Sequence, residues 1–220
     1  AAARIRRLNE QAEIVVFERS KFISYANCGL PYYIGDVITD PENLTLQTPE
    51  SFFSRFRVNM KVRHEVTAIH PDKKTVSVKN LQTGEEFEES YDKLILATGA
   101  ECNIPPIKGA DSKNVYVIRK LADANAIREK LDSVTDIAVI GGGVLGLAAA
   151  WEFRRGKKNV TIIEVSAGLM KNQLDAHASQ IPREAAESSG IQVITNAEID
   201  QIAENGVDLA DGTKVPGQLG

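Results

Sequence analysis

The stretch IAVIGGGVLG, at positions 137–146, determines how this 220-residue chain folds. Its four apolar residues predict a buried strand, its glycines predict a tight turn, and residues 147–155 predict a helix. A second apolar run, VTIIE, follows at 160–164 and ends in Glu164. This order of strand, Gly-x-Gly-x-x-Gly turn, helix and acidic-ended strand is typical of a dinucleotide-binding βαβ unit.

The glycines of such a turn let a pyrophosphate approach the backbone, and the helix N-terminus faces it. We expect Glu164 to accept hydrogen bonds from ribose hydroxyls and to repel a 2′-phosphate, which favours NADH, with NADPH still possible. A purely structural glycine turn is the alternative. The turn residues expected to bind the dinucleotide are Gly141, Gly143, Val144, Leu145 and Gly146.

The start of the chain reads as the second half of another such unit. AAARIRRL at 1–8 predicts a helix, and EIVVFE at 13–18 predicts a buried strand that ends in Glu18. Both units carry Arg-Arg late in the helix, and superposing these pairs places the counterpart of Gly146 just before Ala1. We therefore expect the natural protein to have a strand and a glycine loop ahead of Ala1.

The rest of the chain predicts short elements around two domains. The expected fold class is α/β, with two Rossmann-like dinucleotide-binding domains, each with a parallel sheet and a small antiparallel β-meander. Residues 1–106 are expected to form the first domain and residues 107–220 the second, joined by a proline-rich linker at 103–109. The remaining elements are helices at 50–56 and 123–131 and strands at 59–63, 66–69, 75–79, 85–89, 93–97 and within 206–215.

Composition narrows the possible functions. The chain is 43% hydrophobic and 25% charged, with a net charge of −4, so it can bury a core and gives no reason to expect nucleic acid or a membrane surface as partner. No apolar run approaches the roughly 20 residues of a membrane span. Two cysteines are too few for a disulfide scaffold, so a reducing, cytoplasmic location is expected. The three histidines are isolated, and no metal site is expected.

One cysteine stands in a distinctive context, SYANCGLPYYIG at 24–35. Asn27 is a favourable helix N-cap, Pro31 is tolerated in a first turn, and Gly35 ends the apolar run, which predicts Cys28 at the entrance to a short helix. A thiolate is favoured there. Buried, inert packing is the alternative for Cys28, and a structural role is expected for Cys102.

This segment resembles the single-cysteine active site of the flavin-dependent pyridine nucleotide-disulfide oxidoreductases, closest to the coenzyme A-disulfide reductase branch. EESYDKLILATGA at 88–100 resembles the second flavin-contacting segment of that family. Position 33 is Tyr, so the second thiol of a Cys-x4-Cys box is absent.

The resemblance implies FAD and NADH as cofactors, Cys28 as the catalytic thiol, and reduction of coenzyme A disulfide, its persulfide or a related small disulfide. It also implies a homodimer formed through a C-terminal domain that lies outside residues 1–220. The implied flavin-binding residues are Glu18, Arg19, Val66, Ala97, Thr98 and Gly99. The implied substrate-binding residues are Arg4, Arg7, Ser24 and Asn27.

Two other functions remain open. An NADH oxidase or peroxidase would cycle Cys28 through a sulfenic acid. A flavoprotein that passes electrons to a protein carrier would not need Cys28, and residues 169–175 resemble nitrite- and rubredoxin-reductase flavoproteins. Since the first glycine loop lies outside the sequence, residues 1–220 alone are expected to bind NADH weakly and FAD poorly.

Overall fold

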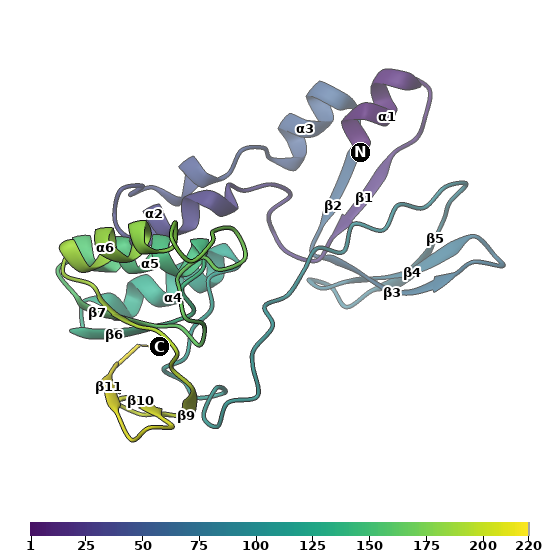
Figure 1. Ribbon diagram of the computed structural model, residues 1–220. Helices are drawn as coiled ribbons and strands as arrows, with labels where there is room; N and C mark the ends of the chain where they lie inside the picture. The colour runs from purple at the N-terminus through teal and green to yellow at the C-terminus, as the bar shows by residue number, and fades with distance from the viewer. Residues whose placement is uncertain (220) are drawn as a thin grey trace. The chain divides into compact units, whose positions relative to one another are not determined.

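The computed structural model describes residues 1–219 and divides the chain into two compact units (Figure 1). Unit 1 consists of residues 1–26 and 42–100, and unit 2 consists of residues 27–41 and the chain from 101 onward. Each unit holds a parallel sheet and a small antiparallel sheet, which confirms the predicted α/β class. The assignment of 1–106 to a flavin domain and 107–220 to a nicotinamide domain stays a prediction.

Unit 1 begins with helix α1 (Ala2–Leu8), followed by strand β1 (Val15–Glu18). Helix α3 (Pro49–Phe56) starts where predicted, because Thr48 and Ser51 form a reciprocal capping box. Strand β2 (Asn59–Val62), at the position predicted for a strand, then pairs with β1 in parallel.

The antiparallel sheet of unit 1 is the predicted meander. It has the order β3 (His64–His70), β4 (Thr75–Asn80) and β5 (Glu86–Ser90). Val76 and Val78 alternate inward along β4 and are buried, as expected for a strand with one covered face. A register shift between Val66 and Ala68 interrupts the pairing of β3 with β4.

The predicted strand at 93–97 is wrong. In the structure this segment has no regular secondary structure, and Leu96 is 65% exposed. Apolar side chains alone do not make a strand, because the backbone N–H and C=O groups also need a paired neighbour, and no ladder in residues 1–219 includes this segment.

Unit 2 is built on a parallel sheet of β6 (Asp136–Ile140), β7 (Asn159–Ile163) and β8 (Gln192–Ile194). Its main helices are α4 (Leu121–Leu131), α5 (Val144–Arg155) and α6 (Gln180–Ser188). The sequence predicted α4, α5, β6 and β7 within a few residues, whereas β8 has only three residues and was missed.

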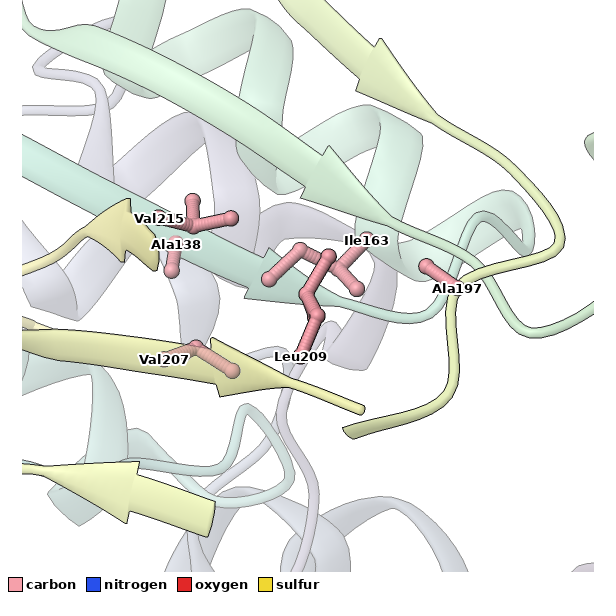
Figure 2. Close-up of a cluster of buried hydrophobic side chains, with 6 residues drawn as sticks. All are labelled: Ala138, Ile163, Ala197, Val207, Leu209 and Val215. Carbon is pink, nitrogen blue, oxygen red and sulfur yellow. The ribbon is translucent and has the colours of Figure 1, made fainter. Parts of the chain in front are cut away.

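A second, antiparallel sheet completes unit 2, with β9 (Ile199–Ala203), β10 (Gly206–Leu209) and β11 (Lys214–Pro216). Side chains from both sheets, and Ala197 from the loop between β8 and β9, meet in a buried cluster (Figure 2) that excludes water between them. Its members are Ala138, Ile163, Ala197, Val207, Leu209 and Val215.

Residues 27–41, called the cysteine segment from here on, belong to unit 2 by their contacts. This segment forms a 3-10 turn, η1 (Asn27–Gly29), followed by the short helix α2 (Leu30–Ile34), which packs against α4 and α5 (Figure 1). Another 3-10 turn, η2 (Pro41–Leu44), follows. Pro31 lies in the first turn and Gly35 caps the C-terminus, both as predicted.

Candidate active site

The glycine loop lies where the sequence places it, between β6 and α5. Gly141 has φ +103°, a backbone conformation that favours glycine, and Gly143 is the N-cap of α5. A Cβ at Gly146 would lie 2.0 Å from the carbonyl oxygen of Gly141, so the third glycine lets helix and loop pack closely. A Cβ at Gly141 or Gly143 would meet nothing within 4 Å, which leaves space above the loop.

Glu164 directly follows β7 and is bound to the loop. Its Oε2 accepts a hydrogen bond from the backbone N–H of Gly142 at 2.7 Å, and its Oε1 accepts one from the N–H of Ser166 at 2.8 Å. Burial raises the pKa of this carboxyl, but hydrogen bonds from Ser166 and Gly142 and the charge of Lys171 outweigh it, so the pKa lies below the ordinary value. Glu164 is therefore a fixed carboxylate at neutral pH.

This arrangement fits a nicotinamide dinucleotide. The open loop can admit a pyrophosphate at the N-terminus of α5, a helix of 12 residues, and the carboxylate lies at the adjacent strand end, where a ribose binds in such units. Val144 and Leu145 are exposed on the first turn of α5. The roles assigned to these residues remain predictions.

Glu18 in unit 1 has the same local geometry as Glu164. It ends β1, and its Oε1 accepts a hydrogen bond at 2.8 Å from the N–H of Ser20, two positions further on. This repetition fits a second ribose at the end of β1. The neighbouring Arg19 forms an ion pair with Glu65 at 3.8 Å.

The other residues predicted to bind flavin lie on β3 and in the segment after β5. Val66 is partly exposed beside the register shift in β3. Ala97, Thr98 and Gly99 are exposed in a segment without regular structure, and Gly99 has φ +75°. They are available to a ligand, and their flavin contacts stay a prediction.

Two of the predicted substrate residues share one surface of unit 1. Arg4 and Arg7 are exposed three positions apart on α1, as a phosphate-binding pair would require. Ser24 lies in the loop that follows β1. Arg6, between the two arginines, instead binds backbone carbonyl oxygens within unit 1, including that of Phe56 at 2.8 Å.

Cys28 is exposed in η1, so its thiol can meet a substrate. The predicted cap is wrong, however: the N-cap of α2 is Gly29 with no side-chain hydrogen bond, whereas Asn27 begins the preceding 3-10 turn. The tighter turn shifts the start of the α-helix from Cys28 to Leu30. Cys102 is exposed as well, outside any helix or strand.

The sequence did not indicate two groups of residues that fix Glu164 and the cysteine segment in place. The N–H groups of Gly142 and Ser166 bind Glu164, and Arg128 of α4 binds the cysteine segment through Tyr33, 95 positions away. Among residues 1–219, no cluster of three or more His, Cys, Asp or Glu side chains could hold a metal ion. None of the helices in this part of the chain has the length and hydrophobicity that a membrane crossing requires.

The two parallel sheets, the acidic strand ends and the glycine loop give the chain the α/β fold of the FAD- and NAD(P)-binding oxidoreductases. The chain belongs to the pyridine nucleotide-disulphide oxidoreductase family, which it matches over residues 1–219. This confirms the resemblance read from the sequence. FAD and NAD(P)H are the cofactors of this family.

Curated relatives of the chain include coenzyme A disulfide reductases. The coenzyme A disulfide reductase of Staphylococcus aureus (strain JH9) is 37% identical over 213 residues, which cover 96% of this chain and 48% of that protein. The chain thus spans about half the length of the curated relatives it matches.

Solved structures similar to the chain include two reductases and an oxidase. Reduced CoADR-RHD of Bacillus anthracis has a TM-score of 0.95 at 34% identity, covering 99% of this chain and 40% of that chain. A NAD-dependent persulfide reductase from A. fulgidus has a TM-score of 0.94 at 28% identity, covering all of this chain and 42% of that chain. The water-forming NADH oxidase of Lactobacillus brevis has a TM-score of 0.89 at 30% identity, covering 98% and 48%.

Proposed function

We propose that the protein is a flavoenzyme that uses NAD(P)H, with NADH favoured, to reduce coenzyme A disulfide, coenzyme A persulfide or a related small disulfide through Cys28. The observation that carries this proposal is the exposed Cys28 on its short turn, in a chain whose relatives include coenzyme A disulfide and persulfide reductases. Tyr33 occupies the position at which two-cysteine members have a second thiol.

The two nucleotide sites support the proposal that NADH and FAD supply the electrons. In unit 2, the glycine loop would bind the pyrophosphate of NADH. The Glu164 carboxylate would accept hydrogen bonds from the hydroxyls of the NADH ribose and would repel a 2′-phosphate. In unit 1, Glu18 would hold the ribose of FAD in the same way. When bound, the two cofactors supply hydride transfer and a two-electron path to a disulfide.

Cys28 would carry out the sulfur chemistry. Its thiolate attacks one sulfur of the disulfide, a new S–S bond forms, and the other half leaves as a thiolate that takes up a proton. Two electrons from NADH then break the mixed disulfide, which releases the second thiol and restores the Cys28 thiolate. One NADH and one proton thus convert one disulfide into NAD⁺ and two thiols.

Substitution of the thiol tests the proposal. We expect Cys28→Ser to abolish NADH-dependent reduction of coenzyme A disulfide, while Cys102→Ser, the matched control at the other exposed cysteine, retains it. Turnover measured by NADH absorbance and by free thiol decides the matter. Unchanged thiol release by Cys28→Ser would rule out this mechanism.

The L. brevis oxidase supports a second candidate at similar identity, an NADH oxidase or peroxidase in which Cys28 cycles through a sulfenic acid. Mass spectrometry of the purified protein separates the two. A coenzyme A adduct on Cys28 supports the reductase, and a sulfenate or sulfinate supports the oxidase or peroxidase.

A further inference from the structure

We infer that Arg128, on α4, is a positioning residue for Cys28: it fixes α2 on unit 2 and thereby the direction in which the η1 turn presents the thiol. The inference rests on the proposed role of Cys28. It concerns a side chain on α4, far from the cysteine in the sequence.

Arg128 binds three different groups of the cysteine segment. Its guanidinium lies over the Tyr33 ring, 4.3 Å from the centroid. Its Nη1 donates to the carbonyl oxygen of Tyr33, and its Nη2 pairs with Asp36 Oδ1 at 2.5 Å. Asp36 is 71% exposed, so the ion pair alone would be weak, but stacking and carbonyl binding act on the same planar group.

A second bond from α4 reinforces this contact. The Tyr33 hydroxyl donates to Asn125 Oδ1 at 2.9 Å, so Tyr33 is held at its ring, its carbonyl oxygen and its hydroxyl. Tyr33 is only 6% exposed, and Leu30 and Ile34 beside it are buried too. Four of the five residues of α2, all but Tyr32, are therefore buried in the unit and cannot shift without breaking these contacts.

Helix α5 restrains the other end of α2. A Cβ at Gly35 would lie 2.7 Å from the Cβ of Glu152, so the backbone after α2 touches α5 directly. Glu152 is 3% exposed, and its carboxylate accepts a hydrogen bond from Arg155 at 2.7 Å. Helix α2 is thus held by α4 through Arg128 and by α5 through close packing.

The η1 turn runs directly into α2, so the position of α2 determines how Cys28 is presented. Thiol attack needs the reacting atoms about 3–3.5 Å apart and in line, and a misplacement of about 1 Å can cost roughly a hundredfold in rate. Lysine could keep the charge near Asp36, but it has no planar fork to stack on Tyr33 while binding two acceptors.

The experiment compares Arg128→Gln and Arg128→Lys with Lys130→Gln, which removes a charge from an exposed position on the same helix. Hydrogen exchange reports on the segment through the Gly35 and Val37 amides, which bind Pro31 O and Tyr32 O. Stopped-flow measurements on the flavin-loaded protein separate reduction by NADH from reoxidation by coenzyme A disulfide.

For Arg128→Gln we expect exchange at both amides to rise at least about tenfold and reoxidation by the disulfide to slow about tenfold or more. NADH affinity and the rate of reduction by NADH should stay within about twofold, Arg128→Lys should recover only part of the loss, and Lys130→Gln should match the wild type. Tyr33→Phe, which keeps the ring and loses one hydrogen bond, should give a smaller effect of the same kind if Arg128→Gln does not fold.

Equal losses in both half-reactions, or loss of NADH affinity, would mean that Arg128 only supports the fold of unit 2. Unchanged exchange and reoxidation would overturn the inference as well. Failure of the proposed function looks different: Cys28→Ser would then reduce the disulfide normally, while the exchange measurement would still report whether Arg128 holds α2.

Discussion

Arg6 and Arg154 make the same connection in the two units. Arg6, on α1, donates through Nε to Phe56 O, at the end of α3, at 2.8 Å, and Arg154, on α5, donates through Nε to Ser189 O, just after α6, at 2.9 Å. Each also binds the carbonyl oxygen four positions later in its own chain segment. The guanidinium satisfies carbonyl groups that a helix end leaves free, so the arginine ties one helix to the end of another.

Arg6 lies between the exposed Arg4 and Arg7, so the effect on stability of replacing Arg6 can be compared with that of replacing Arg7. Arg6→Met should lower the free energy of unfolding of unit 1 by about 1–3 kcal/mol, because the carbonyl oxygens of Phe56 and Arg57, at the C-terminus of α3, lose a charged donor. Arg7→Met should change it by less than about 0.5 kcal/mol, since Arg7 is exposed. Urea unfolding measures both.

The same pair also tests substrate binding. If Arg7 contacts coenzyme A phosphates, Arg7→Met should raise KM for the disulfide without changing stability. Equal stability losses in both variants would contradict the structural role assigned to Arg6.

Two glycines of the loop should respond differently to alanine. Gly146→Ala should destabilise unit 2 by about 3 kcal/mol or more, because the Cβ would lie 2.0 Å from a backbone oxygen that cannot move aside. Gly143→Ala should cost about 1 kcal/mol or less, yet weaken NADH at least tenfold by filling the space a pyrophosphate needs. Calorimetric titration with NADH measures this affinity. A folded Gly143→Ala variant with normal NADH affinity would show that NADH does not bind at the glycine loop.

Glu164 should make the stability of unit 2 depend on pH. Its pKa is lowered in the folded state, so its contribution is complete above the ordinary glutamate pKa, roughly 4.3, and is lost as pH falls through the folded value. Glu164→Gln should therefore cost about 1–2 kcal/mol at pH 7, and the difference from wild type should shrink below about pH 4. Urea unfolding from pH 7 to pH 3 measures it; a constant difference would show that the charge is irrelevant.

Gly35→Ala should disturb the packing of α2 against α5. The backbone at Gly35 has φ −84°, which alanine adopts freely, so any cost comes from contact with Glu152 at 2.2 Å from Oε2 and 2.7 Å from Cβ. Overpacking of this kind costs about 1–3 kcal/mol. Thermal unfolding and the rate of Cys28 alkylation in a Cys102→Ser background should both change, and a wild-type melting temperature would contradict the packing described here.

The sequence alone was sufficient to predict features that depend on residues close together along the chain. The glycine spacing at 141–146 and the acidic strand ends at Glu18 and Glu164 predicted two dinucleotide units. The strands predicted at 66–69, 75–79 and 85–89 form the meander. Each is a local property, because turns need particular backbone angles and strands repeat with a period of two. Local patterns failed at Asn27, where a 3-10 turn replaced the expected cap, and at 93–97, which pairs with no strand in the described part of the chain.

Only the tertiary structure decided what each local feature packs against. Arg6 and Arg7 are identical and adjacent in sequence, yet Arg6 binds carbonyl oxygens 50 positions away and Arg7 faces solvent. Arg128 reads as an ordinary helical cation until the fold brings it to Tyr33. Such contacts join residues from distant elements, and their partners are set by how helices and sheets bury their apolar faces together, which no short stretch of sequence encodes.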